Sequence, residues 1–317
     1  MIAAYVFRSE PGLLDHATPV ADASSWMPEY GGYFWLDNRR LLAFRPAGMS
    51  VQAVRVPAGG SSAVALPELS GALQRGGGVS VATWRLSRDG TRLLWNSVAN
   101  GGWSLTDVAT GVTTRQRAGS GNMALWSPGS RTWLDIRPPR AQARTVSVAE
   151  IGLDGREMGR PGGDMHSQSG WAIGVTPRRT IVFFDPARLS QGTSPQCQWS
   201  EETIGASPRL VSHGLTALPE YASGITEAEL SPDGTRIALL VQSDYESPLD
   251  RLLARFFHIP SKPRVKARLW VVRTDGSGKA LVGAEADGIP FGVMWRTDGA
   301  SISLVDHGKL YTIPAPK

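Results

Sequence analysis

Cysteine and long hydrophobic runs are nearly absent from this sequence. Its 317 residues include one cysteine, Cys197, so no disulfide can form within the chain, and a disulfide-stapled scaffold is excluded. We expect Cys197 to be a small core residue in a third strand of its sheet. No apolar run approaches the roughly 18 residues of a membrane-spanning helix. The fold must therefore depend on an ordinary hydrophobic core.

Motifs of several enzyme classes are also missing. The sequence has no Gly-x-Ser-x-Gly nucleophile elbow, and neither Gly59–Gly60 nor Gly76–Gly78 is followed by the Lys-Ser/Thr of a phosphate-binding loop. The five histidines lie in unrelated contexts, and no Cys/His spacing matches a zinc site. We therefore predict no metal and no cofactor, and favour a protein without catalytic activity.

Residues 1–8 read Met-Ile-Ala-Ala-Tyr-Val-Phe-Arg and lack the basic start and long apolar centre of a signal peptide. Two locations stay open. One is the cytoplasm, and the other is the periplasm or cell envelope, with an export signal or anchor removed from the sequence.

The formal net charge is +5 and the isoelectric point is near 9.6. A basic protein attracts acidic partners, but an arginine-rich genome gives the same balance. We expect no nucleic-acid partner, a protein partner first, and a small-molecule or glycan ligand second.

The most informative stretch is Ser231-Pro232-Asp233-Gly234, which lies between two apolar runs, 225–230 and 237–241. Proline presets the second turn position, aspartate bonds local amides, and glycine accepts a positive φ. Two apolar runs around such a turn predict a β-hairpin. The second run is apolar on both faces, which indicates a strand covered on two sides.

Degraded copies of this hairpin recur along the chain. About six copies spaced roughly 40 to 65 residues apart fall in the range of propeller blades. A large apolar residue precedes each turn, and we expect it to pack between neighbouring blades. These residues are Trp35, Leu86, Trp126, Val175, Leu230 and Trp295.

A further strand and an Asp/Gly turn follow several of the hairpins, at 103–111, 146–155 and 269–276. Each unit then has four antiparallel strands, as a propeller blade does. The predicted fold is all-β: a six-bladed β-propeller forming a single domain over residues 1–317.

The stretch Ser231-Pro232-Asp233-Gly234-Thr235-Arg236-Ile237-Ala238 resembles the repeat of the TolB-like, WD40-like (PD40) six-bladed β-propellers, and 106–111 is similar to their third-to-fourth strand turn. The other copies depart from the motif, since 87–90 lacks the proline and 127–129 lacks the aspartate. The resemblance implies the fold over most of the chain and a mostly periplasmic location. It says little about function, because such propellers serve as binding platforms and as domains of peptidases.

The last unit has only three strands before the chain ends. The β-rich run Ile2–Phe7 belongs to no unit. We predict that it pairs beside Lys309–Ile313 and closes the ring, which removes exposed sheet edges.

The fifth unit carries an insertion, 244–266, in place of a short turn. Ser247-Pro248 predicts a helix start, and Pro260 ends the helix. Three destinations for its apolar stripe stay open: its own propeller, a partner or second copy, or an anionic membrane surface. The stripe comprises Leu249, Leu252, Leu253, Phe256 and Phe257, with Arg251 and Arg255 on the other side.

Acidic residues are expected near the central tunnel. Glu227 and Glu229 lie two apart on an innermost strand and so share a side, while Glu220 and Asp287 lie in links between blades. One hypothesis is a polar ligand pocket at the tunnel mouth, and the alternative is a water-filled channel lined by polar groups. The predicted pocket residues are Asp164, His166, Tyr221, Glu227 and Phe291.

A loop with Arg137, Arg140 and Arg144 is either an acidic-group site or a solvated charged loop. Three functions follow from these features. The first is a non-catalytic binding or scaffold propeller that uses the face carrying the inter-blade links. The second is a glycan- or peptide-acting hydrolase or lyase with carboxylates at the tunnel mouth. The third is a self-associating structural protein joined through residues 246–264.

Overall fold

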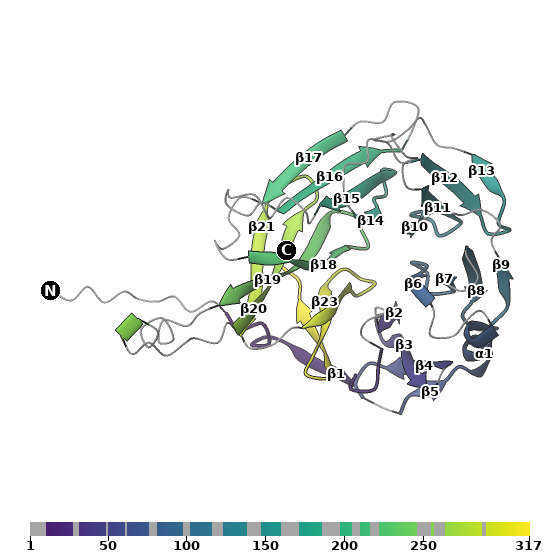
Figure 1. Cartoon of the computed structure of the whole chain (residues 1–317), viewed down its shortest axis with the longest axis horizontal. Helices are drawn as coiled ribbons and strands as arrows, with labels where there is room; N and C mark the ends of the chain where they lie inside the picture. Colours follow the sequence, from purple (N-terminus) through teal and green to yellow (C-terminus); the bar gives the residue numbers. More distant parts are fainter. Residues whose placement is uncertain are drawn as a thin grey trace.

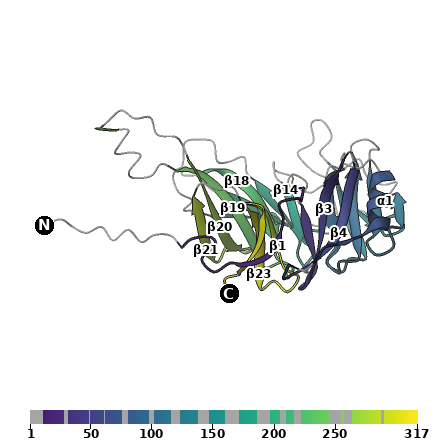
Figure 2. The ribbon, with the colours of Figure 1, turned by 90° about the horizontal axis from the view of Figure 1, so that it is seen from below.

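The chain forms a ring of small sheets, seen down its axis in Figure 1 and from the side in Figure 2. This arrangement comes from a computed structural model. The residues that it describes are 11–27, 32–48, 50–60, 62–75, 81–97, 102–115, 123–137, 147–159, 171–185, 197–204, 210–215, 222–245, 255–256, 264–286 and 290–317.

Each of the six sheets has four antiparallel strands, which confirms the predicted six-bladed propeller. The first three blades, from the axis outward, are β2 to β5 (Tyr33–Asp37, Arg40–Ala47, Ser50–Pro57, Val64–Ala65), β6 to β9 (Val81–Leu86, Arg92–Ser97, Trp103–Asp107, Thr113–Arg115), and β10 to β13 (Met123–Trp126, Thr132–Arg137, Ser147–Gly152, Glu157–Gly159). The others are β14 to β17 (Trp171–Val175, Thr180–Asp185, Cys197–Thr203, Leu210–Leu215), β18 to β21 (Ala222–Leu230, Arg236–Tyr245, Arg264–Arg273, Lys279–Ala286), and β22, β23, β24 and β1 (Phe291–Trp295, Ser301–Asp306, Lys309–Pro314, Thr18–Asp22). Cys197 thus begins a third strand, as predicted.

The ring is closed by an N-terminal strand, but not by the predicted one. Thr18–Asp22 pairs antiparallel with β24, so it occupies the edge assigned to Ile2–Phe7, which lies outside the described residues. The β-propensity of residues 2–7 is high, whereas a proline at position 19 disfavours a strand over 18–22. At the outermost edge, however, a strand tolerates proline because its outward N–H needs no ladder partner.

The segment before β1 also holds the ring. Leu13 donates its N–H to the Ala284 carbonyl (2.8 Å), and Ala284 donates to the Pro11 carbonyl (2.9 Å). Leu13 is only 1% exposed in the core shared by the fifth and sixth blades. The N-terminal segment therefore ties both blades together at the rim.

The repeated turn is one physical unit. Asp233 Oδ1 accepts the Ser231 hydroxyl (2.5 Å) and the Thr235 N–H (3.0 Å). Gly234 has φ +71°, and a Cβ there would lie 2.7 Å from Pro177 Cδ in the preceding blade. Glycine therefore serves both the turn and the close approach of two blades. The equivalent bonds in the second blade join Asp89 to Ser87 (2.5 Å) and to the Thr91 N–H (3.1 Å).

The large residues before the turns include three tryptophans that bond to the preceding blade. Each indole donates its N–H across the blade interface, which confirms the predicted position between blades. The three bonds run from Trp35 to Ser303 Oγ (2.8 Å), from Trp126 to the Arg85 carbonyl (3.0 Å), and from Trp295 to the Glu229 carbonyl (3.0 Å).

A helix, α1 (Pro67–Arg75), lies between the first two blades, and it was not predicted from the sequence. Leu69, Ala72 and Leu73 are buried on it, and the Ser70 hydroxyl accepts the Ala53 N–H of β4 (2.9 Å). The signals were present, because proline is favoured at the first helical position and glutamate in the first turn. The glycine-rich residues that flank this segment obscured these helix signals.

The insertion of the fifth blade is shorter than predicted. β19 and β20 pair as far as Tyr245 and Arg264, so 246–263 separates them. Arg255 and Phe256 are helical there, and Phe256 is 64% exposed. The rest of the predicted helix lies outside the described residues: Leu249, Arg251, Leu252, Leu253 and Phe257. Across the described ranges, no helix has the length and apolar character to cross a membrane.

Candidate functional site at the axis of the ring

The innermost strands β2, β6, β10, β14, β18 and β22 surround the axis (Figure 1). Within the described part of the chain, charged and polar side chains of four blades meet near it. The ladder of β18 with β19 is regular from Glu227 to Glu229, so these two carboxylates share a side, as predicted.

Glu227 joins the fifth blade to the sixth. Its carboxylate accepts the N–H of Gly292 (2.8 Å) and the N–H of Val293 (2.5 Å). The ladder of β22 with β23 is interrupted between Phe291 and Met294, and Gly292 has φ +67°. Such a bulge turns successive amides out of the ladder, and amides grouped in this way bind anions.

Tyr33 extends the connection to the first blade. Its hydroxyl donates to the Gly292 carbonyl (2.6 Å) and lies 2.8 Å from Ser303 Oγ. A Cβ on residue 292 would lie 3.1 Å from the Tyr33 ring. Burial raises the pKa of Tyr33 above its ordinary value, so the phenol stays protonated and remains a donor. The first, fifth and sixth blades are thus joined at the axis.

Glu229 is the second axial carboxylate. Burial raises its pKa to about 7, the positive charge of Arg85 acts in the opposite direction, and the charge of Glu227 adds to the rise. The charge of Arg88 acts on the pKa of Glu229 in the same direction as that of Arg85, and Arg88 donates from Nη2 to the Val175 carbonyl of the fourth blade (2.7 Å). A carboxyl group with a pKa near neutral pH therefore lies near the axis, and the charges of two arginines act on it.

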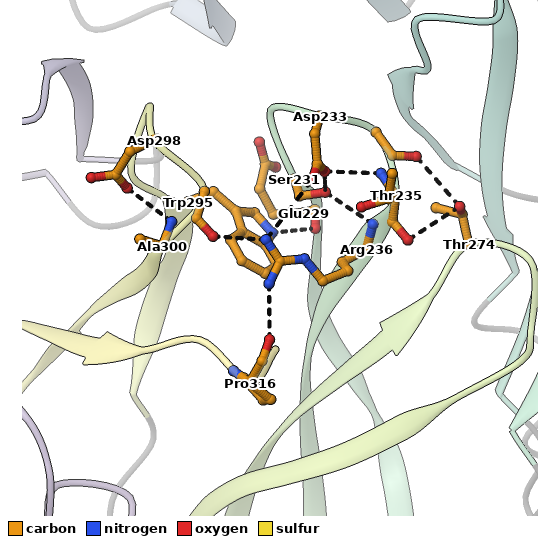
Figure 3. A network of polar contacts seen from close by, with 12 residues as sticks. Glu229, Ser231, Asp233, Thr235, Arg236, Thr274, Trp295, Asp298, Ala300 and Pro316 are labelled. Atoms are coloured by element: carbon orange, nitrogen blue, oxygen red, sulfur yellow. Dashed lines mark hydrogen bonds and ion pairs between the residues drawn. The ribbon is translucent and has the colours of Figure 1, made fainter.

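The Glu229 backbone belongs to the network drawn in Figure 3, where Trp295 Nε1 bonds to its carbonyl. Arg236 lies over the Trp295 ring at 4.8 Å. It donates to the carbonyls of Pro316 (2.9 Å) and Gly299 (2.8 Å). The C-terminal segment is therefore held against the fifth blade.

Only two of the predicted pocket residues can be placed. Glu227 is in the inter-blade bridge, and Phe291 packs, partly buried, against the core that contains Tyr33. Asp164, His166 and Tyr221 lie outside the described residues, as do Glu220 and Asp287. The sequence missed Tyr33, Arg85, Arg88 and Gly292. The one usable signal was a glycine inside a strand pattern, which is typical of a bulge.

The predicted arginine loop begins in an ion pair. Arg137 Nε lies 2.8 Å from Asp135, and its Nη2 lies 3.4 Å from Glu157. Arg140 and Arg144 are outside the described residues. Over the described ranges, no group of three or more His, Cys, Asp or Glu is placed to hold a metal ion.

Fold and axial site together define a six-bladed β-propeller. No family model matches the chain, and no curated protein matches it. Solved structures do. The Kuenenia stuttgartiensis hydrazine synthase is 14% identical with a TM-score of 0.51, over 88% of this chain and 74% of that one.

Two further structures are similar. TolB from Acinetobacter baumannii is 16% identical with a TM-score of 0.48, over 88% of this chain, which spans 64% of TolB. An oligogalacturonate lyase in complex with manganese is 11% identical with a TM-score of 0.49, over 95% and 91% of the two chains. At these identities the likeness concerns the fold alone.

Proposed function

We propose that the protein is a non-catalytic binding or scaffold propeller that meets a protein partner through the face carrying the inter-blade links. The observation that supports this proposal is the role of Glu227 in joining two blades. Each oxygen of this carboxylate accepts a backbone N–H of the sixth blade. A group committed to joining blades is poorly suited to proton transfer, because a general acid or base must be free to exchange protons with substrate.

The choice of face follows from the fifth blade. β19 and β20 have 10 residues each, and their connection leaves the sheet from the side that carries the links between blades. Phe256 is exposed in that connection. Lys266 and Arg268 alternate along β20, so they share one side of the strand. The Arg255 guanidinium lies 5.8 Å from the centre of the Phe256 ring, and an exposed aromatic side chain beside an arginine is typical of a protein-binding surface.

The experiment compares two photo-cross-linking positions on opposite faces. Benzoylphenylalanine replaces Phe256 in one protein and Val112 in the other, since Val112 is 66% exposed in the β8–β9 turn of the far face. Illumination in the native cells should give a discrete protein adduct at 256 and none at 112. Equal adducts at both positions, or none at either, would count against the proposal. Co-sedimentation of the unmodified protein with anionic vesicles would instead favour the membrane alternative.

One observation favours a second function, a glycan- or peptide-acting hydrolase or lyase. The pKa of Glu229, about 7, suits a general acid or base at neutral pH. If the protein has this function, it should turn over a glycan or peptide substrate, and the Glu229→Gln substitution should abolish that turnover. Product formation that is equal in the variant would exclude Glu229 as its catalyst.

We also propose a location in the periplasm or cell envelope. The support is the resemblance of residues 231–238 to the repeat of TolB-like propellers. Fractionation of the native cells with an antibody to the protein tests this location, and recovery in the cytoplasmic fraction alone would contradict it.

A further inference from the structure

A groove lies where the last blade meets the first. Its volume is about 1090 Å³, close to the upper end for small-molecule sites. It opens on the face of the β2–β3 and β22–β23 turns, which is opposite to the proposed partner face. The proposed function therefore does not account for it.

One wall of the groove is apolar and fixed by backbone bonds. Pro19 lines it from β1, and Pro57 and Ala58 line it from the end of β4. The Gly59 N–H donates to the Val20 carbonyl (3.1 Å), and the Ala58 N–H donates to the Arg39 carbonyl (2.7 Å). The first bond joins the two blades and the second holds the β2–β3 turn against the end of β4, so the wall is preformed.

The rest of the lining carries a net positive charge. The lining includes three arginines, Arg39, Arg40 and Arg296, and one carboxylate, Asp37, which gives +3 − 1 = +2. Arg40 is neutralised by Asp37 at 2.5 Å. Within the described chain, the exposed Arg39 side chain has neither a hydrogen bond nor an ion pair. Its charge is available to a ligand.

The Arg296 side chain is held in place, but its positive charge is only weakly compensated. Its guanidinium lies 5.3 Å from the Trp35 ring centre and donates to the Asn38 carbonyl (2.7 Å). Its nearest carboxylate, Asp298, is 3.8 Å away, and its buried Nε–H has no acceptor among the described residues. A buried donor without a partner and a weakly compensated charge both favour an anion nearby.

We propose that this groove binds a small amphipathic carboxylate, an acid group on an aryl or alkyl body. Arg39 binds the carboxylate, Arg296 adds a fixed positive field, and the wall of Pro19, Pro57 and Ala58 packs on the apolar body. Arginine suits this role because its planar fork matches a carboxylate. The ligand would lie across the seam of the ring and so contact both terminal blades.

The test uses anilinonaphthalene sulfonate, a fluorescent aryl anion, with displacement by 4-phenylbutyrate. Arg39→Gln should weaken both affinities about tenfold, as expected for one lost charge-assisted bond. The control is Arg131→Gln, which removes an exposed arginine from the corresponding turn of the third blade. It should bind like the wild type. The uncharged 4-phenylbutanol should displace the dye at least tenfold less well than the acid.

Equal dye affinity in Arg39→Gln and Arg131→Gln would overturn the proposal, and so would equal displacement by the alcohol and the acid. Arg39→Lys should keep part of the affinity because the charge is retained. Circular dichroism of each variant confirms the fold. Because the groove is on the far face, these results are independent of the cross-linking at Phe256.

Discussion

The hydroxyl of Tyr33, on the first blade, donates a 2.6 Å hydrogen bond to the carbonyl of Gly292, on the last blade. The two residues are 259 positions apart, yet they meet at the axis. The same two blades meet again at the rim, where β1 completes the last sheet. The ring is thus closed at both its inner and its outer circumference.

Tyr33→Phe tests the inner closure. Removing the hydroxyl leaves the Gly292 carbonyl without this donor, so the free energy of unfolding should fall by about 1–3 kcal/mol. Tyr311→Phe is the matched control, since no hydrogen bond of the Tyr311 hydroxyl is found among the described residues. Urea unfolding at pH 7 measures both. Equal midpoints for the two variants would show that the bond does not stabilise the ring.

The sequence predicted the features that depend on neighbouring residues. The turn at 231–234 could be read because proline, aspartate and glycine act within four positions, and the structure confirms its bonds. The closing strand could not be predicted in this way, because its pairing with β24 depends on contacts between residues that are far apart in the sequence. Intrinsic preference favoured residues 2–7, and tertiary contacts favoured Thr18–Asp22.

The candidate site shows the same difference between features set by neighbouring residues and features set by distant ones. Strand periodicity placed Glu227 and Glu229 on one side correctly. It could not show that Tyr33 and Arg88 reach the axis from other blades, because the partners of their side chains are 87 or more positions away in sequence. Periodicity gives the side of a strand, but only the assembled ring brings the sides of different blades together.

Two truncations separate the corrected closing strand from the residues before it. Removing 1–10 leaves β1 in place, so the melting temperature should stay within a few degrees. Removing 1–22 takes away β1 and Leu13, which is 1% exposed. The melting temperature should then fall by on the order of 10 °C or more. Similar melting of both truncated proteins would contradict closure by Thr18–Asp22.

The raised pKa of Glu229 gives a pH dependence with a definite sign. From its ordinary value of 4.5 to its folded value of about 7, the folded state keeps a proton that the unfolded state has lost. Stability from this group therefore falls as pH rises through that window and is constant above it. The Glu229→Gln variant does not lose stability in this way. Its free energy of unfolding should therefore match that of the wild type near pH 4 and exceed it at pH 8.

The expected gain at pH 8 is roughly 2 kcal/mol, less than the full shift implies because Glu229 is partly exposed and screened. Urea unfolding at several pH values measures it. Glu227 is present in both proteins, so the difference between them reports the titration of Glu229 together with its coupling to Glu227. Parallel curves for wild type and variant from pH 4 to pH 8 would show that the pKa is ordinary.

We expect the axial carboxylate Glu227 to stabilise the ring rather than to take part in a reaction. The most direct test of this expectation is urea unfolding of Glu227→Gln at pH 7, beside Glu157→Gln, whose carboxylate is in a rim ion pair with Arg137 at 3.4 Å. The amide would place an N–H₂ against the donors of Gly292 or Val293, so the free energy of unfolding should fall by about 2 kcal/mol. The rim variant should change by less than about 1 kcal/mol. A Glu227→Gln protein as stable as the rim variant would contradict the account.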